Sequence, residues 1–136
     1  MKRRDFIKTT LLIAAGSAMS NSSIAIAGNT SKFSGVIYTS ADPGKWAKKI
    51  AGHEPKVSIE GKKVMIATHH SMSEEHYIVR HTLVLEDGTV VGAKTFYPLQ
   101  DTKAVSTFEL PAGYKAKFYA TSFCNLHDLW VTENQA

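Results

Sequence analysis

The sequence predicts an all-β protein, an immunoglobulin-like antiparallel β-sandwich, from three observations. Short β-prone runs recur along the chain, and several alternate polar and apolar residues as half-buried strands do. Turn signals containing glycine, proline or aspartate separate these runs. No long segment has the periodicity of an amphipathic helix. About seven short strands joined by turns are typical of an immunoglobulin-like sandwich.

The first half of the mature chain contains three expected strands. Residues 36–39 are β-prone, and the turn signal at residues 42–44 follows them. Residues 45–51 are expected to form one helical turn or an irregular loop. Residues 56–60 alternate polar and apolar side chains, and a glycine turn leads from them into the next strand, residues 64–68.

The second half begins with a predicted hairpin. Residues 76–85 and 90–97 are β-prone and flank Asp87-Gly88, a pair that suits tight turns in which both central positions need φ > 0. Three further strands are expected at residues 104–110, 114–123 and 129–132.

The first 27 residues have the composition of an export signal. A basic start is followed by a weakly apolar run at residues 9–19 and by a small-residue end at residues 25–27. The apolar run is shorter than the roughly 20 residues that a transmembrane helix needs. Because Arg3 and Arg4 resemble the twin-arginine export motif, we expect a mature periplasmic domain of residues 28–136. An ordinary secretory signal or an uncleaved anchor remains the alternative.

The charge of the mature domain gives no indication of a nucleic-acid partner. Four Lys or Arg residues and one Asp leave with the first 27 residues, which lowers the formal charge from +4 to +1. No basic stripe with interleaved aromatic residues remains in the sequence. Membrane contact is not expected after signal removal, and homo-oligomer formation is left open.

Three short segments hold the residue types that bind metals. The spacing of Cys124 and His127 lets a thiolate and an imidazole reach one metal from a single tight turn. His70 and His76 flank a polar loop that can curl both rings toward one point. With His53, the three segments offer five nitrogen or sulfur ligands, and the only cysteine of the chain is among them.

Two other histidines are expected to stay outside this site. His69 is adjacent to His70, and neighbouring residues at a strand end point to opposite sides. His81 lies inside a predicted strand, on the face that would carry Val79 and Leu83, and is expected to be a surface or hydrogen-bonded residue.

The segment Cys124-Asn125-Leu126-His127-x-Leu129-Trp130 resembles the motif of the superoxide reductases, the neelaredoxin and desulfoferrodoxin iron-binding domains. Residues 70–78 resemble the family's histidine-proline-loop-histidine segment, with Ser71 in place of the usual proline. Residues 52–55 resemble its first histidine, which lies two residues before a proline. The resemblance covers about the last 85 residues, the size of one domain.

This resemblance implies an immunoglobulin-like sandwich that holds one iron ion per chain. It implies that the ring nitrogens lie in a plane, that the sulfur lies on the axis, and that superoxide binds opposite the sulfur; the ligands would be His53, His70, His76, His127 and Cys124. The reaction would combine superoxide, one electron from a periplasmic donor and two protons to give hydrogen peroxide. The residues expected to act in catalysis are Cys124, His127, Lys48 and Lys49. Backbone amides of residues 125–127 are candidates for hydrogen bonds to the sulfur.

The chain departs from the family pattern at three positions. Ala51 and Gly52 stand where the family places a glutamate and a lysine before the first histidine. Lys48 and Lys49 lie nearby and are expected to take over attraction of the anion, because steering depends on local potential. Asp128 replaces the usual glycine, and its negative charge is expected to repel superoxide or to raise local proton availability.

Other functions fit parts of the same pattern. The main alternative is an exported metal-binding or electron-transfer module without superoxide reductase activity. Copper would need two histidines, a cysteine and usually a methionine, and zinc would close a tetrahedral site with Cys124 and three histidines. A carrier of sulfur compounds would instead use Cys124 as an accessible nucleophile of low pKa.

Overall fold

The computed structural model describes residues 32–136, and the predicted export signal at residues 1–27 lies outside this part. Residues 33–136 form one unit. Its elements are β1 (Ile37–Tyr38), η1 (Gly44–Lys49, a 3-10 helix), α3 (Ile50–His53), β2 (Lys56–Glu60), β3 (Lys63–Thr68), β4 (Ile78–Leu85), β5 (Val90–Thr95), β6 (Ala104–Glu109), β7 (Lys117–Cys124) and β8 (Asp128–Gln135). Within the described residues, no helix has the length and apolar character required to cross a membrane.

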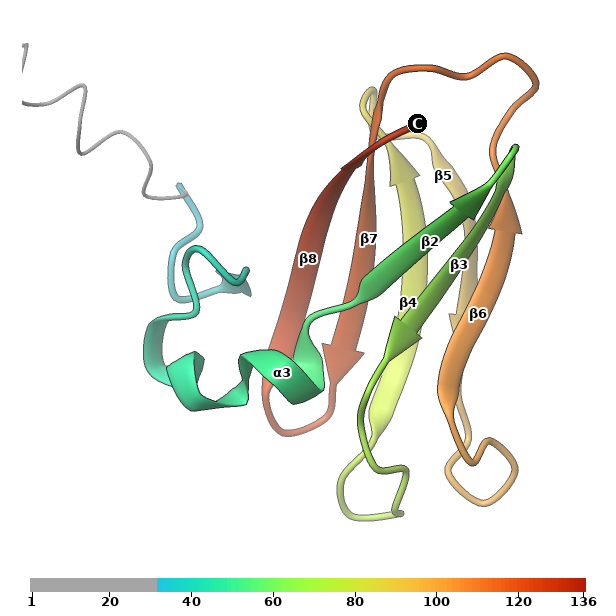
Figure 1. The fold of residues 1–136 in the computed structure, drawn as a ribbon. Helices are drawn as coiled ribbons and strands as arrows, with labels where there is room; N and C mark the ends of the chain where they lie inside the picture. Colours follow the sequence, from blue (N-terminus) through green and yellow to red (C-terminus); the bar gives the residue numbers. More distant parts are fainter. Residues whose placement is uncertain (1–31) are drawn as a thin grey trace, which may run out of the picture. The chain divides into compact units, whose positions relative to one another are not determined.

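The strands form two sheets that face each other (Figure 1). One sheet has five strands in the order β1-β8-β7-β4-β5, and the other has three in the order β2-β3-β6. The predicted antiparallel sandwich is therefore confirmed. The two-residue strand β1 is an exception, because it pairs with β8 in parallel.

The strand boundaries differ from the predicted ones at both ends of the sandwich, and β7 begins at Lys117 and not at residue 114. β2 has the predicted bounds, but β4 begins at Ile78 and not at residue 76. The backbone N–H of Ser73 donates to the carbonyl of His76 at 3.1 Å, so His76 belongs to a loop turn. β8 extends to Gln135, beyond the predicted residue 132, because β7 provides hydrogen-bonding partners along its whole length.

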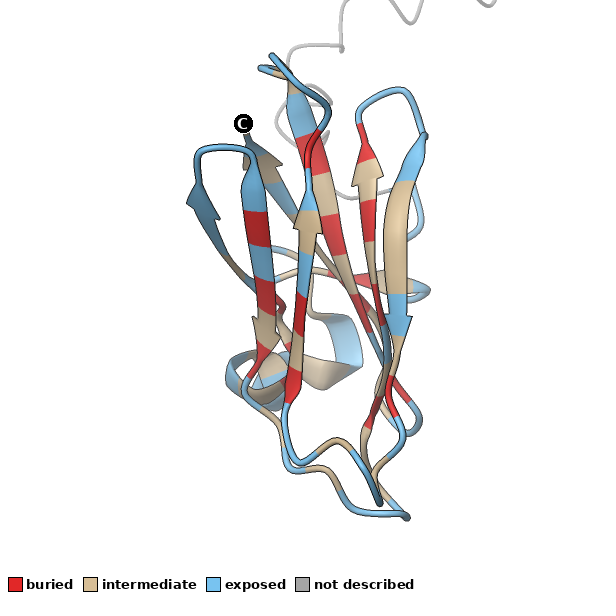
Figure 2. Ribbon diagram, turned by 90° about the vertical axis from the view of Figure 1, so that its right-hand side faces the viewer, coloured by how far each residue is buried: buried red, intermediate tan, exposed pale blue. Residues whose placement is uncertain are grey.

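Inward-facing side chains fill the space between the sheets, and buried and less buried residues alternate along the strands (Figure 2). The larger core cluster is centred on Val64, Ile66, Leu83 and Phe118. A smaller cluster is formed by Ile78, Phe96, Ala104 and Cys124. The single cysteine is therefore part of the apolar interior, at the end of the sandwich where β7 ends.

A register irregularity in β4 changes which residues of this strand face the core. Ile78 pairs with Cys124, but Arg80 pairs with Phe123, so Val79 is the extra residue of a bulge. Ile78 is fully buried and Val79 only partly, which corrects the predicted face that contained Val79. Bulges re-aim side chains beside functional sites, and this one lies directly opposite Cys124.

His81 is fully buried and joins the two sheets through hydrogen bonds. Its ring nitrogens lie 2.8 Å from Thr68 Oγ1 and 2.8 Å from Ser106 Oγ, and Thr68 Oγ1 lies 2.8 Å from Ser122 Oγ. Burial, and to a lesser extent the charge of Lys94, lowers the pKa of His81 from 6.5 to about 4. The ring is thus neutral at pH 7, and each of its nitrogens has a partner, as a hydrogen-bonded residue outside the metal site should have.

His81→Gln is expected to make the metal-free protein less sensitive to acid. Because the folded-state pKa is lower than the unfolded one, the unfolded chain binds more protons below pH 6.5, and stability falls as the pH falls toward 4. Between pH 7 and pH 5 the wild-type protein should lose about 2 kcal/mol of unfolding free energy through His81. Urea unfolding at both pH values measures the difference, and equal losses in both proteins would contradict it.

Candidate metal centre

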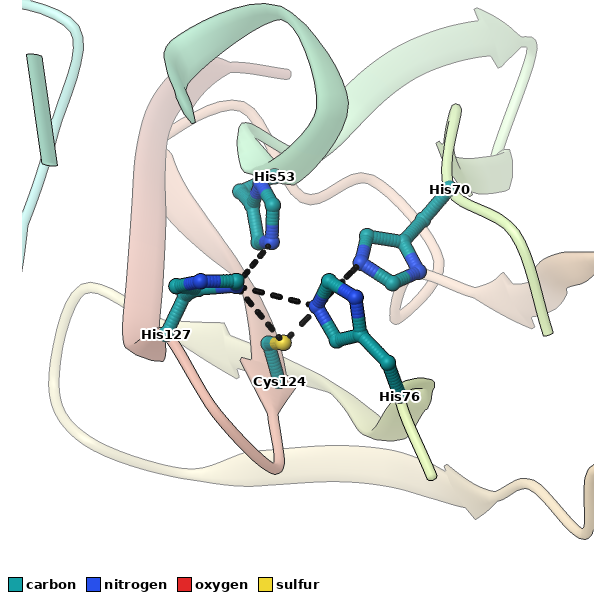
Figure 3. Close-up of side chains that lie close together, drawn as sticks. All are labelled: His53, His70, His76, Cys124 and His127. Atoms are coloured by element: carbon teal, nitrogen blue, oxygen red, sulfur yellow. Dashed lines mark hydrogen bonds between the residues drawn. The ribbon is translucent and has the colours of Figure 1, made fainter. Parts of the chain in front are cut away.

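Five metal-ligating side chains meet at one end of the sandwich (Figure 3). They are His53, His70, His76, Cys124 and His127, and their ligand atoms all lie within 4.8 Å of one another. The structure thus brings together every residue that the sequence predicted for the metal site. His69 and His81 are not members of this cluster.

Each ligand is placed by the end of a regular element. His53 is the last residue of α3, and Cys124 is the last residue of β7. His70 and His76 lie in the loop between β3 and β4, and His127 lies in the turn between β7 and β8. Ligands on short loops anchored by strands can converge without disturbing the sheets themselves.

Asn125 ties two of these ligand-bearing loops together. Its Oδ1 accepts the backbone N–H of Tyr77 at 3.0 Å, and its Nδ2 donates to the carbonyl of Glu75 at 2.9 Å. Its backbone N–H also donates to the carbonyl of Tyr77 at 3.2 Å. The predicted importance of residue 125 rested on its backbone amide, so this side-chain role was missed.

The imidazole nitrogens follow one another around a common centre. His53 Nε2 lies 3.0 Å from His127 Nδ1, which lies 2.9 Å from His76 Nε2, which lies 3.0 Å from His70 Nε2. The rings of His53 and His70 close the circuit in an edge contact. Neighbouring ligands at right angles around an ion, each about 2.1 Å from it, would be about 3.0 Å apart, which is the observed spacing.

The outer nitrogens of two rings are already committed to backbone carbonyls. His53 Nδ1 donates to the carbonyl of Lys49 at 2.9 Å, and His70 Nδ1 donates to the carbonyl of Ser71. In a neutral imidazole this leaves Nε2 with a lone pair and no proton. These lone pairs point at the centre of the cluster, and a hydrogen bond from the outer ring nitrogen to a backbone carbonyl is typical of metal-bound histidines.

Three histidines of the cluster have a lowered pKa, which favours the neutral, metal-binding form of the ring. Burial lowers the pKa of His53 from 6.5 to about 4. Burial also lowers the pKa of His70 and of His127, and the neighbouring histidines lower each further. Neutral imidazoles are available as ligands at pH 7 without loss of a proton.

The pKa of Cys124 shifts in the opposite direction, which favours the protonated thiol over the metal-binding thiolate. Burial raises the pKa of the Cys124 thiol, although the backbone N–H groups of Leu126 and His127 act to lower it. These two amides are the hydrogen bonds to sulfur that the sequence suggested. A buried thiol of raised pKa is a poor free nucleophile, which argues against the sulfur-carrier alternative.

The donor set suits some metals better than others. A structural zinc site closes with four ligands, and five donors converge here. A blue-copper site uses two histidines and would leave two imidazoles without a role. Four imidazoles with one thiolate suit iron, for which both ligand types are common.

Of the two lysines that were expected to attract the anion, only Lys49 has an identified electrostatic effect on the cluster. The charge of Lys49 contributes to the lowered pKa of His70 and His127 and favours the Cys124 thiolate. Lys48 is not among the causes of these shifts. Gly52 has room for a side chain, because an added Cβ would meet only the carbonyl oxygen of His69, at 3.6 Å.

The carboxylate of Asp128 is not a free charge beside the site. Its Oδ2 accepts a hydrogen bond from Trp46 Nε1 at 3.0 Å and lies 3.7 Å from Lys45 Nζ. The Trp46 ring packs edge-on against the His127 ring, with centroids 4.7 Å apart. The negative charge of Asp128 was expected to repel superoxide or to raise local proton availability, and the contacts with Trp46 and Lys45 reduce that charge's effect at the site.

Binding of Fe²⁺ to the metal-free protein at pH 7 is expected to release about one proton per ion. The thiol of Cys124 is protonated at this pH because its pKa is raised, whereas the histidines with lowered pKa have no proton to lose. Anaerobic titration calorimetry in two buffers of different ionisation enthalpy gives the proton count. Cys124→Ala should abolish the release, and release retained in that variant would contradict the assignment.

Comparisons with known proteins agree with this geometry. The family profile described as Desulfoferrodoxin matches residues 46–133, which is more than half of the chain. A search of curated proteins gave no match.

Solved structures with the same fold include three superoxide reductases. The enzyme from Giardia intestinalis (1Fe-SOR) is 25% identical, with a TM-score of 0.55, covering 62% of this chain and 98% of that chain. The neelaredoxin from Ignicoccus hospitalis is 25% identical, with a TM-score of 0.60, covering 77% and 97%. The enzyme from Treponema pallidum is 30% identical, with a TM-score of 0.50, covering 60% and 66%. The chain therefore belongs to the desulfoferrodoxin family.

Proposed function

We propose that this protein is a superoxide reductase, which converts superoxide to hydrogen peroxide by adding one electron and two protons. His53, His70, His76, His127 and Cys124 would hold one iron ion, and the bound iron would supply the electron. The convergence of these four imidazoles and one thiolate, in a chain of the desulfoferrodoxin family, carries the proposal. The similar solved structures named superoxide reductases support it.

The five metal-ligating side chains differ in burial, which supports access for a small substrate from the more exposed side. Cys124 and His53 are buried, whereas His70, His76 and His127 are partly exposed. The sulfur lies among the apolar side chains of Ile78 and Phe96, on the interior side of the rings. A small anion would therefore approach from the solvent side, opposite the sulfur.

Hydrogen bonds around Cys124 would moderate the electron donation of its thiolate to a bound metal. A thiolate ligand would donate electron density to a bound iron, which would favour transfer of an electron to superoxide. The amides of Leu126 and His127 withdraw part of that density by hydrogen bonding to sulfur. Such a balance favours release of an intact peroxide over cleavage of its O–O bond.

Lys49 is the residue that we assign to attraction of superoxide. Its side chain is exposed, and its charge acts on three members of the cluster. Positive potential at an open site concentrates anions and raises their association rate. Lys49 would thus take over the role of the lysine that the family pattern would place at position 52, where this chain has Gly52.

The proposal includes a periplasmic location and a periplasmic electron donor. The composition of residues 1–27 supports export through the twin-arginine pathway, which would place the domain in the periplasm. A periplasmic donor would then have to return one electron to the iron in each cycle.

A second function is favoured by one observation, the presence of Ala51 and Gly52 where the family pattern has a glutamate and a lysine. A protein with the same metal centre but without these side chains could transfer electrons without reducing superoxide. Superoxide decay in the presence of the iron-containing protein distinguishes this function from the first.

Protein purified without added metal is expected to contain one iron per chain and to show a visible sulfur-to-iron charge-transfer band when oxidised. Pulse radiolysis should then show loss of superoxide with formation of one peroxide and no oxygen. Cys124→Ser should lose the band, and His76→Ala should lose most of the iron. An iron centre that leaves superoxide decay unchanged would support the electron-transfer module instead.

Lys49→Ala is expected to slow superoxide capture about fivefold at low ionic strength, and the difference should shrink as salt screens the charge. Lys48→Ala is the matched control, because it removes the same charge one residue away and should have a smaller effect. Stopped-flow or pulse-radiolysis rates over a range of salt concentrations measure both. Equal effects of the two variants would contradict a specific role for Lys49.

Gly52→Lys in the Lys49→Ala background is expected to restore capture. A Cβ added at Gly52 would lie 3.6 Å from the carbonyl oxygen of His69, which is an ordinary van der Waals contact, so the fold should tolerate the substitution. Recovery in the same rate measurement would show that positive charge near the first histidine limits capture. A correctly folded, iron-containing variant without recovery would contradict the electrostatic explanation.

A further inference from the structure

We propose that Asp128 is a positioning residue, whose carboxylate fastens the η1 segment to the metal centre through Trp46 and so places Lys49 beside the site. The fastening itself is independent of the reaction, whereas its effect on superoxide rests on the proposed function.

The backbone of Asp128 adopts a conformation that glycine would adopt with less strain. Its φ is +66°, and it is the only non-glycine residue with positive φ in residues 32–136. Side chains with a Cβ are disfavoured in this region, although aspartate tolerates it better than most. A glycine would make the same turn, so the aspartate side chain is expected to contribute something that offsets its backbone cost.

The contacts of the carboxylate show what it contributes. Trp46 Nε1 donates to Oδ2 at 3.0 Å, and Lys45 Nζ lies 3.7 Å from the same oxygen. Both partners belong to η1, which is 82 residues away in sequence from Asp128. The carboxylate therefore joins η1 to the turn that carries His127.

Few other contacts stabilise the position of the η1 segment. It begins without a side-chain cap, it contains no buried residue, and its regular geometry is interrupted at Trp46. Trp46 is only partly buried and packs edge-on against His127. A short 3-10 segment of this kind depends on side-chain contacts, because its own hydrogen bonds are few and of poor geometry.

The end of the same segment touches the site a second time. Lys49 is the last residue of η1, and its carbonyl accepts a hydrogen bond from His53 Nδ1 at 2.9 Å. The segment thus runs from a contact with His127 to a contact with His53. Holding Trp46 in place consequently fixes the path that brings the Lys49 ammonium toward the cluster.

Hydrogen exchange on the metal-free protein tests the fastening without any enzymatic reaction. Asp128→Gly should speed amide exchange in peptides covering residues 44–50 about tenfold, the lower end of the effect of losing one hydrogen bond to a charged group, because the Asp128 side chain is 47% exposed. The thermal midpoint should stay the same or rise, because glycine relieves the backbone. A general structural defect would instead lower the midpoint and speed exchange throughout the sandwich.

Two further variants serve as controls. Trp46→Phe keeps an aromatic ring against His127 but removes the donor, so it should speed exchange as Asp128→Gly does, and combining both changes should add little. Asp128→Asn keeps an acceptor oxygen but loses the charge, so its exchange should be slower than that of Asp128→Gly and at least as fast as that of the wild type. Unchanged exchange in Asp128→Gly, or strictly additive effects in the double variant, would overturn the fastening.

Azide binding to the iron-loaded ferric protein tests the consequence for Lys49. In the wild type, Lys49→Ala should weaken azide binding about fivefold at low salt, whereas in the Asp128→Gly background the same change should have almost no effect. A full Lys49 effect in both backgrounds would overturn the placement of Lys49 by Asp128. Azide binding needs no turnover, so these results are readable even if the protein fails to reduce superoxide.

Discussion

The constraint on which the site depends is the convergence of four imidazoles and one thiol that the fold holds within 4.8 Å of one another. Neighbouring ring nitrogens lie 2.9–3.0 Å apart, next to a sulfur in an apolar environment. Bringing these polar groups together costs conformational freedom and solvation, and a cation offsets that cost by accepting their lone pairs. The strands must therefore supply enough stability to hold these groups in place before a metal arrives.

The sandwich supplies that stability close to the ligands. His81, Thr68, Ser106 and Ser122 join the two sheets by hydrogen bonds from four different strands. Thr68 lies two residues before His70, and Ser122 lies two residues before Cys124. Asn125 then links the two loops above this layer. The ligand positions are thus determined by a polar layer within the sandwich and by one amide side chain at its end.

Local patterns in the sequence were sufficient for much of this arrangement. The alternation in residues 56–60 predicted the bounds of β2, although Ile59 is 39% exposed and the strand is not half-buried. The Asp87-Gly88 pair predicted the turn between β4 and β5, but only Gly88 has a positive φ, +89°, and the expected positive φ at Asp87 is wrong. The spacing of Cys124 and His127 likewise indicated a shared metal. Contacts across long sequence separations were not predictable in this way. The bulge at Val79 depends on pairing with β7, and the partners of Asp128 lie in a segment with no strong local pattern.

The depth of the sulfur has a consequence for the lifetime of the centre. Hydrogen peroxide, the product expected here, oxidises thiolates stepwise to sulfenic and then to irreversible acids, and the rate follows exposure. Cys124 is only 1% exposed, with four imidazole rings on one side and Ile78, Phe96 and Ala104 on the other. Burial would therefore shield the sulfur from the peroxide that the proposed reaction would form beside it, and would slow oxidative loss of the metal ligand.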